Sequence, residues 1–215
     1  MKAMGKFGKE YFSDVYAGGY EQHVPPKRIH YYLGKVMEAK ESGALLDVGC
    51  AYGLFLSEAR RHFNVIGCDV SEHAVGEAAR RLEGVEVINS DVFGIQGSER
   101  FDVVTCFDVL EHLGDPKAAM ARIRDLLRPD GILALTVPVY DTPAGWLVRL
   151  LDRDTTHIQK KSRRFWRDML RLGGFRLVTD TGLWRYTLPG GHAVFFGSRA
   201  LRNFSPAIML IGVKE

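Results

Sequence analysis

The sequence predicts an α/β fold in which a mostly parallel sheet carries helices on both faces. Short apolar runs rich in Val, Ile and Leu alternate with helical stretches from Ala44 onward, the pattern of a sheet that is buried on both sides. The 215 residues are 46% apolar and 26% charged, a balance typical of a soluble globular protein with one sizeable core. We therefore expect a single domain over residues 1–215.

The same alternation predicts the order of the elements. Strands are expected at 44–48, 65–68, 85–88, 101–106, 132–137, 175–181 and 208–214. Helices are expected between them at 54–62, 72–82, 116–127 and 163–172. Ser71 and Ser162 suit helix N-caps, and Pro116 suits a first helical turn. Residues 128–131 (Arg-Pro-Asp-Gly) predict a turn before the fifth strand.

Two regions fall outside this rhythm. Residues 1–43 are rich in Tyr and are broken at Pro25–Pro26, which predicts an N-terminal helical cap across the sheet. Residues 138–161 form a long connection after the fifth strand, and long connections at the carboxyl edge of a parallel sheet tend to carry function. We expect this insertion on the side of the site where a substrate enters.

Composition excludes several classes of function. The net charge of +3 gives no general reason to expect nucleic-acid binding. No apolar run approaches the roughly 20 residues of a membrane-spanning helix, and no signal-peptide core follows the basic N-terminus. The three cysteines, an odd count without Cys-x-x-Cys spacing, predict neither a disulfide framework nor a metal site. A reduced, cytoplasmic setting is expected.

The strongest local signal is the segment Leu45–Phe55, LLDVGCAYGLF. An apolar strand runs into a turn of small residues and then a helix, so a ligand can approach the backbone and the helix N-terminus closely. A turn of this kind can also serve only tight packing. The dinucleotide spacing of glycines is absent, because its three positions hold Gly49, Ala51 and Leu54.

Segments from 46 to 137 resemble class I S-adenosylmethionine-dependent methyltransferases. The matching segments are LDVGCAYG at 46–53, VIGCDVS at 65–71, NSDV at 89–92, FDVVTCFDVLEHL at 101–113 and LRPDGIL at 127–133. The resemblance implies a Rossmann-like, seven-stranded sheet of order 3-2-1-4-5-7-6 with an antiparallel last strand. It also implies S-adenosylmethionine as cofactor and S-adenosylhomocysteine as product.

The resemblance implies that ten residues bind the cofactor: Asp47, Gly49, Cys50, Ala51, Gly53, Asp69, Val70, Asp91, Val92 and Phe107. Asp69 would bind the ribose hydroxyls, or would only cap the following helix. Asp91 would bind the adenine amino group, or would only form a solvated turn. Asp47 would order the loop or contact the methionine amino group. Ala51 replaces the usual second glycine of the motif.

On the acceptor side the residues allow more than one interpretation. Methyl transfer needs alignment first, and a base only where the acceptor loses a proton. Glu111 and His112 follow the fourth strand, and His157 precedes the helix at 163–172. These three residues are candidate catalytic groups, and a structural role is open for each.

A basic segment lies in the same region. Residues 149–171 contain eight basic and three acidic residues. They predict a solvated face, or a surface that attracts an anionic acceptor or a membrane. An apolar stripe beside them, formed by Trp146, Leu147, Leu150 and Leu151, is expected to act as a lid or an interfacial helix. The loop Pro189–His192 is expected near the pocket.

Taken together, the sequence predicts methyl transfer to an oxygen or nitrogen of a small metabolite, anionic or lipid-linked. The alternatives are a non-catalytic S-adenosylmethionine-binding module and, ranked lower, a nucleic-acid methyltransferase. The expected partner is a small-molecule acceptor. Peripheral membrane contact and either a monomer or a homodimer are compatible with the sequence.

Overall fold

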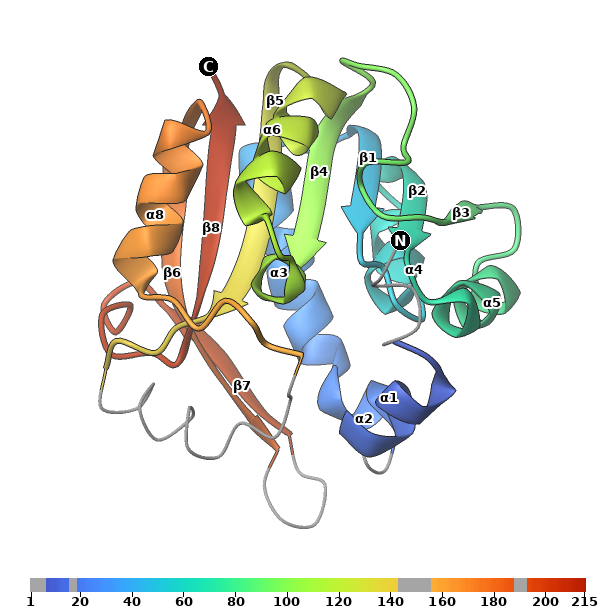
Figure 1. The fold of residues 1–215 in the computed structure, drawn as a ribbon, viewed down its shortest axis with the longest axis horizontal. Coiled ribbons are helices and arrows are strands. Elements are labelled where there is room, and N and C mark those ends of the chain that lie inside the picture. The colour runs from blue at the N-terminus through green and yellow to red at the C-terminus, as the bar shows by residue number, and fades with distance from the viewer. Residues whose placement is uncertain (1–6, 16–18, 143–155, 188–192) are drawn as a thin grey trace.

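The computed structural model describes residues 7–15, 19–142, 156–187 and 193–215 (Figure 1). Within these residues one sheet has eight strands in the order β3-β2-β1-β4-β5-β8-β6-β7. The strands are β1 (Gly43–Val48), β2 (Phe63–Asp69), β3 (Glu86–Asn89), β4 (Phe101–Phe107), β5 (Leu127–Pro138), β6 (Phe175–Thr187), β7 (Ala193–Ser198) and β8 (Ala207–Lys214).

The first five strands are parallel. β1 lies between β2 and β4, with Val48 level with Cys68 on one side and with Cys106 on the other. Helices cover both faces of the central strands, and Leu45 and Leu46 are both fully buried although they point to opposite faces. The carboxyl ends of β1, β2 and β4 therefore meet at one edge of the sheet.

The antiparallel half confirms the predicted order and adds one strand. β8 pairs antiparallel with both β5 and β6, as expected of the last strand. β6 continues beyond the expected end at Thr181, and its extension pairs antiparallel with β7, which is not among the predicted strands. The β-rich sequences on either side of 188–192 form this pair, and Gly197 lets Tyr31 of the cap pack against its backbone.

The predicted turn at 128–131 lies inside a strand. Phe101 of β4 pairs with Leu127, and Val103 pairs with Ile132, so the residues between them bulge out of the ladder. Asp130 takes a left-handed φ of 57° in this bulge. The turn signal was therefore correct for the backbone, but the strand begins before it and not after it.

Two layers of helices enclose the sheet. The helices with counterparts in the prediction are α4 (Leu54–Ala59), α5 (Glu72–Arg81), α6 (Pro116–Leu126) and α8 (Arg163–Leu172). In Figure 1, α6 and α8 lie in front of the sheet and α3 (Pro26–Ala39) lies behind it. The expected caps are present, since Ser71 accepts a hydrogen bond from the Ala74 amide and Ser162 from the Phe165 amide.

Residues 1–43 also contribute α1 (Lys9–Val15) and α2 (Tyr20–His23). Both helices lie beyond the carboxyl ends of β1 and β4 (Figure 1). Phe12 of α1 stacks on Tyr52 of the turn after β1, with the ring centroids 4.7 Å apart. The cap thus touches the turn that the sequence singles out. No helix of the described residues is long and apolar enough to cross a bilayer.

Candidate functional site

The turn after β1 is shaped by residues with left-handed backbone angles. Gly49, Ala51 and Gly53 have φ values of 74°, 46° and 72°. A Cβ on Gly49 would lie 2.3 Å from Cγ2 of Val109, so the close approach of the loop after β4 requires glycine there. The Gly49 and Cys50 amides donate to the Cys68 carbonyl at 2.8 and 3.1 Å. The turn is therefore fixed to the end of β2.

Asp69 ends β2 and joins the turn to α5. One carboxylate oxygen accepts the Ala51 amide and the other accepts the Ser71 amide, both at 2.9 Å. The cap of α5 itself is the Ser71 hydroxyl, so Asp69 is not needed for that task. Burial raises the pKa of Asp69, and the amide hydrogen bonds oppose that shift.

Asp47 lies deeper, at the end of β1. Its side chain is almost fully buried, and the Thr105 hydroxyl donates to Oδ1 at 2.6 Å. Burial raises the pKa of Asp47 to about 7; the Thr105 hydrogen bond opposes this shift and the nearby Asp69 charge adds to it. A cationic ligand group beside Asp47 would favour its ionised form.

These residues border a cavity of about 240 Å³. Nine of the ten predicted cofactor residues line it: Asp47, Gly49, Cys50, Ala51, Asp69, Val70, Asp91, Val92 and Phe107. Gly53 is not among the lining residues. A Cβ on Gly53 would lie 2.5 Å from Cδ1 of Leu82, so its role in the described structure is close packing of the turn against the end of α5.

Asp91 and Val92 form the far wall of the cavity, after β3. Oδ1 of Asp91 accepts the amides of Phe93 and Gly94 at 3.0 and 3.2 Å, so the carboxylate shapes its own turn. Val92 is buried against the sheet. Asp91 thus stabilises its own turn, and its position in the cavity wall is compatible with the predicted binding role.

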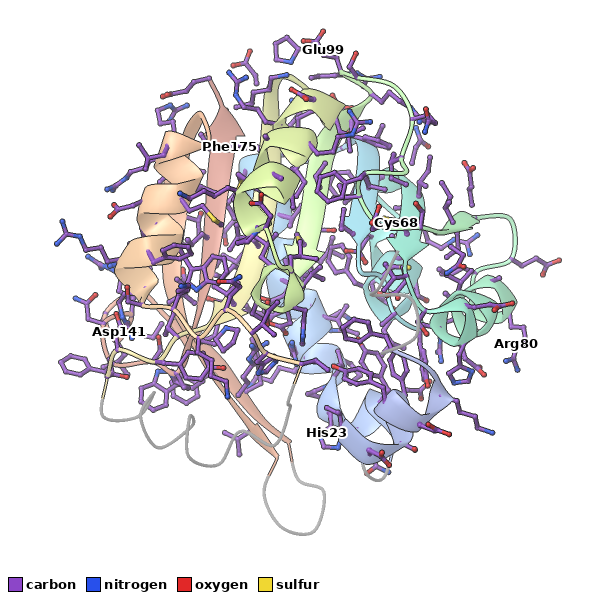
Figure 2. All side chains as sticks on the ribbon, viewed as in Figure 1. His23, Cys68, Arg80, Glu99, Asp141 and Phe175 are labelled. Atoms are coloured by element: carbon purple, nitrogen blue, oxygen red, sulfur yellow. The ribbon has the colours of Figure 1, made fainter. Side chains whose placement is uncertain are left out.

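Aromatic rings form a second part of the cavity wall, and some of them lie against the turn after β1. The N-terminal cap supplies Phe7, Tyr11, Phe12, Tyr20 and Tyr32 to the lining. Figure 2 shows many ring side chains between the cap helices, where His23 is labelled, and the carboxyl ends of the strands. The sequence pointed to this region only through its tyrosines, and the individual lining residues were not predicted.

Arg28, which was not predicted, and Asp108, which follows the fourth strand, also line the cavity. Two guanidinium groups, those of Arg28 and of Arg185 on β6, donate to the same Asp108 oxygen. Thr136 donates to the other oxygen at 2.9 Å. Burial alone would raise the pKa of Asp108, but Arg185 and Arg28 outweigh it and hold that pKa well below its ordinary value. Arg28 sits in the first turn of α3, whose start Pro25–Pro26 does signal.

The three candidate catalytic residues come together beside the aromatic part of the cavity wall. Glu111 and His112 lie in a short 3-10 helix, η1 (Leu110–His112), and the His112 and His157 ring centroids are 4.7 Å apart. Among them only His112 lines the cavity. Thr156 Oγ1 lies 2.9 Å from His112 Nδ1, and Tyr140 Oη lies 3.4 Å from His157 Nδ1.

Glu111, His112 and His157 each place one ligand-type atom within 4.8 Å of the others. A carboxylate and two imidazoles are groups of the kind that hold a metal ion, and the same groups can donate and accept protons.

The basic segment is partly structural. Arg163 is buried, where it pairs with Asp141 at 3.0 Å, and Arg167 pairs with Asp180 at 2.9 Å. Figure 2 places Asp141 at the end of α8 nearest the cap side of the molecule. The apolar stripe at 146–151 and the loop at 189–192 lie outside the described residues.

A family profile described as a methyltransferase domain matches residues 18–204. The chain belongs to this methyltransferase family. Membership confirms the resemblance to class I methyltransferases, the fold class, and S-adenosylmethionine as the cofactor.

Named relatives agree with this family. The chain is 32% identical to a ubiquinone biosynthesis O-methyltransferase of Aeromonas salmonicida over 50% of its length and 48% of the relative. It is 28% identical to the enzyme of the same name from Alkalilimnicola ehrlichii, over 69% of this chain and 62% of that one. The chain thus spans about half to three fifths of the length of these methyltransferases.

A solved structure supports the fold. Magnesium protoporphyrin IX methyltransferase of Synechocystis PCC 6803, with bound SAH, matches with a TM-score of 0.65 and 21% identity. The match covers 88% of this chain and 83% of that methyltransferase. At this identity the likeness concerns the architecture, and the acceptor has to be inferred from the residues of the site.

Proposed function

We propose that this methyltransferase transfers a methyl group from S-adenosylmethionine to an oxygen of a small aromatic acceptor. The observation that carries the proposal is that one cavity is lined by buried carboxylates, by aromatic rings and by His112. The names of the relatives support oxygen over nitrogen as the acceptor atom. The aromatic lining supports a flat acceptor such as a phenol.

The acidic residues of the cavity fit the cofactor. Asp69 is held by two backbone amides, so its remaining lone pairs can accept the two ribose hydroxyls. Asp91 would accept the adenine amino group. Asp47 would face the methionine amino group, and Arg28, which also lines the cavity, would pair with the methionine carboxylate. When bound, the cofactor supplies an electrophilic methyl group on a sulfonium.

Beside the aromatic rings this chain has to orient the acceptor and remove one proton. A phenol becomes a strong nucleophile when it loses its proton, so a base at the hydroxyl accelerates the transfer. His112 is the candidate that reaches the cavity. Its neutral imidazole would take the phenolic proton while the oxygen attacks the methyl carbon, and the aromatic walls would keep water out.

Transfer of a CD3 group tests this proposal. We expect the chain, given S-adenosylmethionine labelled with CD3, to modify the oxygen of catechols or phenols in preference to the nitrogen of matched anilines. Mass spectrometry of the product identifies the acceptor atom. His112→Gln should lower the rate roughly 10²–10⁴-fold, whereas the exposed His62→Gln, a matched control, should leave it unchanged.

The contrary results are equally definite. Binding of S-adenosylhomocysteine without transfer to any phenol, amine or acid would favour a non-catalytic cofactor-binding module. Transfer that is insensitive to His112→Gln but is abolished by a chelator would assign the proton to a metal centre and remove His112 as the base.

A further inference from the structure

The segment that carries Thr156 is attached to the turn that carries His112. The amides of Ile158 and Gln159 both donate to the Glu111 carbonyl, at 3.1 and 2.9 Å. The Gln159 side-chain amide adds a hydrogen bond to the Leu113 carbonyl at 3.0 Å. Residues on either side of His112 are therefore tied to residues that follow Thr156 by two and three positions.

This attachment brings the Thr156 hydroxyl close to a nitrogen of the His112 ring. Thr156 Oγ1 lies 2.9 Å from His112 Nδ1, across 44 residues of sequence. In a neutral imidazole one nitrogen carries the proton and the other does not, and the hydrogen bond of one nitrogen selects the state of the other. A hydroxyl can accept a hydrogen bond from a protonated Nδ1 or donate one to an unprotonated Nδ1, and only the first arrangement leaves Nε2 unprotonated.

We propose that Thr156 is a positioning residue that holds His112 in the tautomer with its proton on Nδ1. Nε2 of His112 is then the basic nitrogen for the acceptor oxygen. The inference rests on the proposed function, in which His112 takes the phenolic proton. Thr156 itself touches neither acceptor nor cofactor in this account, and it does not line the cavity.

The neighbouring histidine supports this arrangement. His157 follows Thr156 directly, its ring lies against that of His112, and its own Nδ1 lies 3.4 Å from the Tyr140 hydroxyl. Phe7 meets the His112 ring edge-on with centroids 5.6 Å apart. The His112 ring is thus enclosed by rings from two segments, so rotation about its side chain is restricted and Thr156 can act on a fixed nitrogen.

The tautomer can be measured directly on the full chain by ¹⁵N–¹H correlation of histidine-labelled protein. The His112 signals among the seven histidines are assigned by their loss in His112→Gln. We expect protonated Nδ1 and unprotonated Nε2 in the unaltered chain. Thr156→Val, which keeps the shape and removes the hydroxyl, should give a mixture of tautomers, and Thr156→Ser should restore the single one.

Turnover gives the second readout. Thr156→Val should lower kcat about tenfold, as expected for loss of one orienting hydrogen bond, with unchanged affinity for S-adenosylhomocysteine, and Thr156→Ser should recover most of it. A proton on Nε2 in the unaltered chain, or the same tautomer in Thr156→Val, would overturn the inference. Absence of methyl transfer to every acceptor would refute the proposed function instead, and the tautomer measurement would still decide the role of Thr156.

Discussion

At the residue scale, the site depends on carboxylates that the fold buries before any ligand arrives. Asp47 and Asp69 lie at the ends of the neighbouring parallel strands β1 and β2, so their charges are close together in a poorly solvated place, and burial raises the pKa of both. Hydrogen bonds from backbone amides to Asp69 and from the Thr105 hydroxyl to Asp47 partly offset the cost of burying these charges. A ligand with hydroxyl donors and a positive charge offsets the remaining cost, which is the chemistry of S-adenosylmethionine.

Asp69 gives the sharpest prediction at this scale. Asp69→Ala removes the carboxylate expected on the ribose and should weaken S-adenosylhomocysteine binding by roughly 1.5–3 kcal/mol, as for a charged hydrogen-bond partner. Calorimetric titration measures the change. Asp168→Ala, which removes a carboxylate that is 47% exposed on α8, serves as the matched control. Equal affinity in the unaltered chain and Asp69→Ala would remove Asp69 from the ribose site.

At the element scale, the cap is joined to the sheet through separate contacts. Phe12 belongs to a small cluster with Ala51 and Ala74, apart from the two large clusters on the faces of the sheet. Helix α1 has seven residues, too few to be stable alone in water. Its order therefore depends on the ring contacts of Phe12, and it can open while the sheet stays folded.

Phe12→Ala tests this independence. Loss of a core Phe costs about 3–5 kcal/mol of global stability, but here we expect a much smaller change in the free energy of unfolding. Hydrogen exchange followed by mass spectrometry should show loss of protection confined to residues 9–15, with β4 and β5 unaffected. S-adenosylhomocysteine should bind more weakly, since Phe12 lines the cavity. Loss of protection throughout the sheet would show that α1 is part of the main core.

Elements with local signals were predictable, and those defined by distant contacts were not. Ser71 and Ser162 mark their helices through hydroxyls that bond amides three residues away. β7 was missed because its evidence is its pairing with the end of β6, as at Trp184 and Phe196. The bulge at 128–131 shows the same limit, since a turn signal does not tell which strand continues through it.

At the scale of the whole molecule, the sheet order decides where the site lies. β1 is the first strand in the chain and sits centrally, with β2 and β3 on one side and β4 on the other. The connections from β1 therefore run to one side of the sheet, toward β2 and β3, and the next connection returns to the other side, at β4. A crevice opens between β1 and β4 at their carboxyl ends. Asp47 of β1 and Asp69 at the end of the neighbouring β2 line the cavity at this edge of the sheet.

The acceptor side could be predicted only in part. Glu111, His112 and His157 were identified by type and by their places after strands, and the fold does bring them together. Thr156 and Arg28 were not identified. The sequence does not show that Thr156 reaches a ring nitrogen 44 positions away, or that Arg28 reaches a carboxylate 80 positions away. These pairings follow from the three-dimensional packing of the cap and the insertion.

The turn from Asp47 to Gly53 is the proposed binding site of S-adenosylmethionine. Calorimetric titration of the full chain with S-adenosylhomocysteine, with nicotinamide adenine dinucleotide as the comparison ligand, tests it most directly. We expect saturable binding of the first at one site, with an affinity of about micromolar, a binding free energy of about −8 kcal/mol, and no binding of the second. Absence of S-adenosylhomocysteine binding, or equal binding of the dinucleotide, would contradict the claim.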